Sequence, residues 1–225
     1  MNQRLAIDQI HSIISYFIEN MVCVDQNFPS ERAGTIGLSQ SDISYMLRET
    51  AYSEVFKICA QNRDFHLCLL DGALVQFHYT FDTTTGNIEK HRLSYLPNPE
   101  IESYCENEDF EKEWLSDLLF SDIRKESSIQ FPVRFDFDRN ERIFVDNWHS
   151  KSHLTLGNLQ NCRIPVSGPI SPYRFIDFIL RCFYSKKYRD DLDIFECPFI
   201  GESTLSENEK SLLHIGFIHE PGTRP

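Results

Sequence analysis

The sequence lacks the features that most directly assign a chain to a functional class. It has no apolar run near the roughly 20 residues that a membrane-spanning helix needs, and its N-terminus lacks the apolar segment of a signal peptide. It has no P-loop, no Gly-x-Ser-x-Gly motif and no His-Glu-x-x-His motif. Internal repeats, low-complexity runs and Gly/Ser linkers are also missing. We therefore expect a single domain over residues 1–225.

Disulfide chemistry is also disfavoured. The seven cysteines are scattered along the chain and form no Cys-x-x-Cys pair. An odd number without regular spacing fits reduced thiols better than a disulfide framework. Together with the missing signal peptide, this predicts a protein of the reducing cytoplasm.

Positive charge is scarce. Against 34 Asp and Glu there are 22 Lys and Arg, which gives a formal net charge of −12 at pH 7. Such a chain repels phosphate backbones and anionic lipid at long range, so a general nucleic-acid coat protein and a membrane partner are disfavoured. Net charge does not exclude a local basic pocket, which leaves binding of a nucleotide or nucleic acid open.

Apolar periodicity predicts an α+β fold, with a mostly antiparallel sheet and helices packed on one face. The N-terminal part, about residues 1–62, is expected to be helical, with a first helix around Ile10 to Met21 and a second that opens at Ser39. The sheet and helix part, about 63–225, begins with strands at 65–70, 73–81 and 88–96, the first two joined by the turn Asp71-Gly72.

Further elements follow after residue 97. A helix around Trp114 comes first, and then strands at 131–137, 143–148, 153–156 and 162–166. Ser171 followed by Pro172 is typical of a helix start, because serine caps and proline fits the first helical position. Ser206 and Glu209 form a capping-box pattern that predicts one short last helix.

Arginine, carboxylate and histidine side chains cluster between residues 134 and 163. Alternation along strands sends these polar side chains to one face and their apolar neighbours to the other. If the strands are neighbours, one surface gathers the ligand-binding candidates Arg134, Asp138, Thr155 and Arg163 and the catalytic candidates Asp136, His149 and His153. Arginines could hold an anion there, with histidine and carboxylate available for proton transfer. The alternative is an ordinary solvated sheet face with cross-strand ion pairs.

Two other arrangements of these residues are chemically reasonable. Asp146, His149 and His153 offer ligand types that zinc or manganese accepts, but their spacing matches no metal motif, and we predict neither a metal nor another cofactor. His78 and Thr80, with His153 and Thr155, resemble the paired motifs of the two-histidine phosphoesterases. In that family the histidines act as acid and base and the threonines help to bind phosphate.

Three longer strings resemble a bacterial family catalogued as domain of unknown function 2290. They are HRLSYLPNPE at 91–100, PVRFDFD at 132–138 and SHLTLGNLQNCRIPVSGPISPYRFIDFILRCFY at 152–184. The resemblance covers most of the chain from the first hairpin to the Ser171 helix. It implies a bacterial cytoplasmic protein, encoded beside mobile-element or phage-defence genes, and it brings no catalytic residues to carry over.

Three functions therefore compete. The first is an accessory or binding protein whose polar sheet face receives an anionic ligand or the acidic side of a partner encoded nearby. The second is a phosphodiesterase or nuclease-like hydrolase that uses two histidines or a metal. The third is an acidic subunit that inhibits or supports a basic protein through the stretches 106–113 and 189–196. The sequence does not decide whether the protein is an enzyme.

Overall fold

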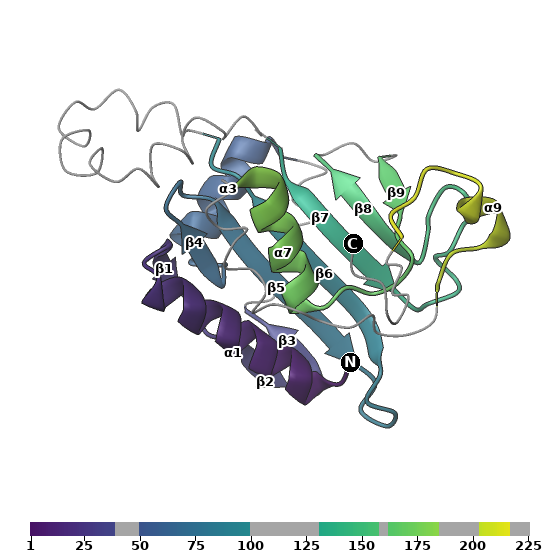
Figure 1. The fold of residues 1–225 in the computed structure, drawn as a ribbon, viewed down its shortest axis with the longest axis horizontal. Helices are drawn as coiled ribbons and strands as arrows, with labels where there is room; N and C mark the ends of the chain where they lie inside the picture. Colours follow the sequence, from purple (N-terminus) through teal and green to yellow (C-terminus); the bar gives the residue numbers. More distant parts are fainter. Residues whose placement is uncertain (39–49, 100–130, 158–161, 185–202, 217–225) are drawn as a thin grey trace, which may run out of the picture.

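The computed structural model describes residues 1–38, 50–99, 131–157, 162–184 and 203–216 (Figure 1). The elements in chain order are α1 (Gln3–Glu19), β1 (Cys23–Gln26), β2 (Ser30–Arg32), β3 (Thr35–Gly37), α3 (Tyr52–Gln61), β4 (Leu67–Leu69), β5 (Leu74–Phe81), β6 (Ile88–Leu96), β7 (Val133–Asp138), β8 (Ser152–Leu156), β9 (Arg163–Pro165), α7 (Pro172–Phe183) and α9 (Glu207–Lys210). Within these ranges, no helix combines the length and apolar character that crossing a membrane would demand.

The nine strands form one antiparallel sheet. Its main path runs β1-β4-β5-β6-β7-β8-β9, and the short β2–β3 hairpin joins through β3, which pairs with β5. From β5 to β8 each strand pairs with its neighbour over most of its length. The expected α+β class with a mostly antiparallel sheet is confirmed.

The first hairpin forms where its turn residues predict it. Gly72 adopts a left-handed backbone with φ of +78°, a conformation that costs glycine little. Asp71 accepts a hydrogen bond from the Ala73 N–H through its side chain. Leu67 and Val75 then face each other across β4 and β5.

One face of the sheet carries the main hydrophobic core, and α1 and α7 cover it (Figure 1). Alternation in β5, β6 and β7 turns apolar side chains toward these helices, among them Phe77, Leu93 and Phe135. The α7 helix begins as predicted, because the Ser171 side chain accepts a hydrogen bond from Arg174 N–H and Pro172 follows it. Burying each large apolar side chain stabilises this layer by about 2 kcal/mol.

Among the described residues, α3 covers one end of the opposite face. Leu74 and Leu96, which face each other across β5 and β6, pack there against Val55, Phe56 and Cys59 of α3. Further along the same strands this face becomes polar. The polar part begins at Gln76 and Ser94, the next residue pair on the same face.

Two expectations differ from the structure. The stretch 1–62 is not helical throughout, because residues 23–37 form β1, β2 and β3, which extend the sheet. The stretch 143–148 is not a strand, because β7 already pairs with β6 on one side and β8 on the other, and only an isolated bridge joins Val145 to His149. The helices expected from Ser39 and around Trp114 lie outside the described residues.

Candidate functional site

The polar face carries two rows of side chains that cross the sheet, because residues directly opposite in antiparallel strands share a face. The polar positions run from β5 to β8 in the first row, which ends at Pro165 of β9, and from β5 to β9 in the second. The first row is His78, Arg92, Asp136 and His153, and the second is Gln76, Ser94, Arg134, Thr155 and Arg163. The alternation in the sequence thus predicts the shared face of Arg134, Asp136, His153 and Arg163 as the structure has it.

This face is not an ordinary solvated surface. The exposed fraction is 6% for His153 and 5% for Thr155, and Ser94 is also buried. Toward the end of β7 the face opens, where Asp138 and Lys90 form an ion pair with 3.4 Å between Nζ and Oδ2. The interpretation as a solvated face with cross-strand ion pairs therefore holds at Asp138 and is wrong for the buried centre.

Asp136 is the charged centre of the first row. Arg92 Nε donates a 2.7 Å hydrogen bond to Asp136 Oδ1. Burial alone would raise the pKa of this carboxyl, but the charges of Arg92 and Arg134, together with the hydrogen bond from Arg92, outweigh it and lower the pKa to about 2. Asp136 is therefore ionised near neutral pH and is a weak proton acceptor.

His153 is neutral, and one of its ring nitrogens is held by a hydrogen bond. Its Nδ1 lies 2.9 Å from the Ser150 carbonyl oxygen, and since a carbonyl only accepts, Nδ1 carries the proton. Its Nε2 lies 3.9 Å from Asp136 Oδ2. Burial lowers the pKa of His153 to about 4, against the attraction of Asp136. Because both nitrogens face protein atoms, His153 is poorly placed to exchange a proton with a substrate.

His149 differs from His153 in having a nitrogen without a partner. The two rings contact each other edge to face, with 5.1 Å between their centres. His149 Nδ1 is buried and has no hydrogen-bond partner among the described residues. Burial and the nearby charge of Arg163 lower the pKa of His149. A buried polar atom left unpaired costs about 1–3 kcal/mol, which a ligand could recover.

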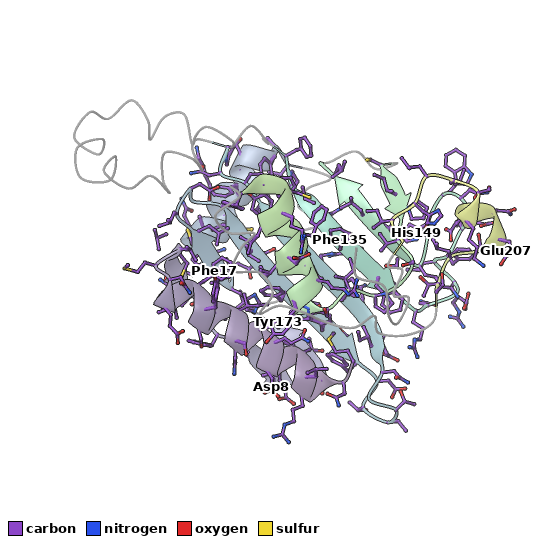
Figure 2. All side chains as sticks on the ribbon, viewed as in Figure 1. Asp8, Phe17, Phe135, His149, Tyr173 and Glu207 are labelled. Atoms are coloured by element: carbon purple, nitrogen blue, oxygen red, sulfur yellow. The ribbon has the colours of Figure 1, made fainter. Side chains whose placement is uncertain are left out.

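A tight turn carries His149 to this position. Trp148 N–H and His149 N–H both donate to the Val145 carbonyl, and Asn147 adopts a left-handed backbone with φ of 63°. The Asp146 carboxylate accepts hydrogen bonds from Ser206 Oγ and Asn208 Nδ2, which ties the turn to α9. Figure 2 shows His149 beside β8 and β9, on the side of the molecule where α9 lies.

The contacts of Asp146 with α9 argue against a metal site formed by Asp146, His149 and His153. Asp146 is engaged with α9, and the described residues hold no group of three His, Cys, Asp or Glu side chains that could bind a metal ion. The described residues therefore do not support the alternative in which Asp146, His149 and His153 form a ligand set. Proximity in sequence does not bring the three together, because the turn after Val145 points Asp146 toward α9.

The two-histidine arrangement is also wrong. His78 and His153 share a face, but β6 and β7 lie between their strands, and Arg92 and Asp136 occupy the intervening positions of the row. Three strand spacings of about 4.8 Å put the two backbones roughly 14 Å apart. Two imidazoles at that separation, with an ion pair between them, do not converge on one phosphate.

Arg92 is the site residue that the cluster between residues 134 and 163 did not include. Its strand was predicted, and alternation with His91 and Leu93 places Arg92 on the polar face. What the sequence does not contain is the pairing of β6 with β7, which sets Arg92 against Asp136. The sequence therefore predicts the face on which Arg92 lies but not the residue that it contacts there.

The family model described as "Uncharacterized conserved protein (DUF2290)" matches residues 22–217. The chain belongs to this family. The match confirms the resemblance and includes every described strand together with α3, α7 and α9, whereas α1 precedes it. No curated protein and no solved structure matches the chain.

Proposed function

We propose that this DUF2290 protein is a binding protein whose polar sheet face receives an anionic ligand beside His149 and His153. The observation that carries the proposal is the buried His149 Nδ1, which has no partner among the described residues. Arg163 contributes positive charge close to both histidines, because its charge lowers the pKa of His149 and of His153. An anion at this place would be attracted to Arg163 and could accept a hydrogen bond from His149.

Binding is favoured over catalysis by the protonation states at the site. A general base works best with a pKa near the operating pH, whereas the pKa of Asp136 is lowered to about 2 and that of His153 to about 4. Arg92 and the Ser150 carbonyl also occupy these two groups. The catalytic roles of Asp136 and His153 are therefore not part of the proposal, which assigns His149, Arg134, Thr155 and Arg163 to ligand binding.

The experiment follows the ring nitrogens of His149 and His153 by NMR while inorganic phosphate is added. A bound anion should raise the pKa of His149, because it offsets the charge of Arg163. An Arg163→Gln variant should lose this response. Arg4→Gln is the matched control, because the Arg4 side chain is exposed and lies on α1. An unchanged pKa of His149 in saturating phosphate, with the fold intact, would count against the proposal.

The setting that we propose is an accessory role in the bacterial cytoplasm, associated with mobile elements or phage defence. It is supported only by the family resemblance, and co-purification from a native host with products of neighbouring genes would test it. The acidic-subunit alternative depends on the stretches 106–113 and 189–196, which lie outside the described residues. No observation on the described residues favours it over anion binding.

A further inference from the structure

Trp148 is an exposed aromatic side chain on a firmly held turn. Its exposed fraction is 70%, the largest among the exposed aromatic residues of the described ranges. The turn has little freedom, because Trp148 N–H and His149 N–H both donate to Val145 O and Asp146 binds α9. An indole kept in water forgoes the stabilisation that burial would give it. A rigid exposed indole is instead suited to stack on a flat ligand.

The indole is next to the proposed anion site. Trp148 and His149 are consecutive, so their Cα atoms lie about 3.8 Å apart. His149 in turn contacts His153, on the strand that pairs with the strand of Arg163. One short turn therefore carries both an exposed aromatic side chain and a ring nitrogen without a described partner.

We propose that the ligand of this site is a nucleoside phosphate, with its base stacked on Trp148 and its phosphate held by His149 and Arg163. This inference rests on the proposed anion-binding function and adds the chemical class of the ligand. Aromatic stacking of a base beside a cationic contact to phosphate is a general means of binding nucleotides. The formal net charge of −12 opposes a long polyanion, so the site suits a free nucleotide or the end of a single strand.

The test compares three probes: inorganic phosphate, a nucleoside monophosphate and a short single-stranded oligonucleotide. Binding is followed by Trp148 fluorescence in a Trp114→Phe background, because the chain has two tryptophans. NMR of the His149 ring reports phosphate binding independently of the indole. The Trp148→Leu variant lacks the fluorescent reporter, so its binding is followed by the His149 ring alone. It should bind the nucleotide roughly 5- to 150-fold more weakly, the range expected for loss of one stacked base, and should bind phosphate unchanged.

Leu213→Ala is the matched control, since Leu213 is also apolar and is 87% exposed. It should leave nucleotide binding unchanged. Phosphate binding without tighter binding of the nucleotide would overturn the ligand assignment and leave the anion site standing. A His149 ring that responds to none of the probes would overturn both. Equal affinity per site for nucleotide and oligonucleotide would support a free nucleotide, and tighter oligonucleotide binding would support a strand end.

A protein partner is the competing occupant of this surface. Val145 and Leu212 are exposed as well as Leu213, and a protein that covers them would bury Trp148 at the same time. In that case Leu213→Ala and Trp148→Leu would both weaken capture of the partner, while the nucleotide would leave Trp148 fluorescence unchanged. That result would overturn the proposed ligand.

Discussion

Arg92 and Asp136 face each other across β6 and β7, with Arg92 Nε donating to Asp136 Oδ1 at 2.7 Å. Both side chains are mostly buried, with exposed fractions of 24% and 14%. In such surroundings a carboxylate that has lost its cation lowers the free energy of unfolding. We therefore expect the Arg92–Asp136 pair to stabilise the middle of the polar face, and the first prediction concerns its removal.

Replacing Arg92 by Gln should destabilise the protein by about 3 kcal/mol, because Asp136 is left as a buried charge with a weaker partner. The pKa of Asp136 should rise at the same time. Urea unfolding measures the first effect and carboxyl NMR titration the second. An Arg181→Gln variant is the control, since the Arg181–Asp177 pair on α7 is more exposed and should contribute less than about 1 kcal/mol. Similar losses in the two variants would contradict the prediction.

Stability should fall as the pH drops from about 6.5 to about 4, because of His91. Its Nε2 accepts a hydrogen bond from Ile170 N–H inside the core, and burial lowers its pKa from 6.5 to about 4. The unfolded chain thus binds a proton in this range before the folded protein does, so protonation favours unfolding. The loss from this residue should be on the order of 3 kcal/mol.

Replacing His91 by Gln keeps a hydrogen-bond acceptor for Ile170 and removes the titration. The variant should therefore show a smaller decrease in the free energy of unfolding between pH 6.5 and pH 4, as measured by urea unfolding at several pH values. His11→Gln serves as the control, because His11 is exposed on α1. The assignment to His91 fails if the pH dependence of the variant equals that of the unaltered protein.

Ser206→Ala should loosen two segments at once. Ser206 caps α9 by accepting from Glu209 N–H, and its hydroxyl also donates to Asp146. Loss of an N-cap costs about 1 kcal/mol, and here the turn of residues 145–149 loses a contact as well. Amide hydrogen exchange should become faster in both segments. Ser211→Ala, which removes a hydroxyl just beyond α9, should leave the turn unchanged, and faster exchange confined to α9 would argue against the coupling.

The family match begins at residue 22, but the folded core begins earlier. Ile13 of α1 is fully buried against the sheet and α7. Ile13→Ala should cost about 2–5 kcal/mol because it opens a cavity in the core, whereas Ser12→Ala, on the exposed side of α1, should cost little. Thermal unfolding distinguishes the two. A chain that starts at residue 22 should lack cooperative unfolding, and a cooperative transition in it would show that α1 is dispensable.

Local sequence patterns predicted the strands in which apolar and polar residues alternate and the helices that begin with a clear capping residue. Alternation in 73–81 and 88–96 predicted β5 and β6, and Ser171 with Pro172 predicted the start of α7. The same alternation placed Arg134 and Asp136 on one face, which made the polar cluster visible before any pairing was known. These features are local, so a single segment contains the information for each.

What the sequence did not predict depends on contacts between distant segments. The strands β1, β2 and β3 have three or four residues each, too few for a recognisable period. The distant strands β4 and β5 pair with β1 and β3, and β2 joins the sheet through β3. Residues 143–148 begin with the apolar run Ile143 to Val145, but β7, the preceding strand, already pairs with β6 and β8. The Arg92–Asp136 contact likewise follows from the order of β6 and β7, which neither strand specifies alone.

The packing of α1 against α7 has a consequence for how the chain is made. The two helices are in contact, although more than 150 residues separate them in sequence. During synthesis α1 leaves the ribosome first, with its apolar side uncovered, while the strands and helix that cover it have yet to be translated. Closure of the core depends on such distant contacts, which slows folding. The nascent protein should therefore depend on chaperones that shield apolar helices until α7 has emerged.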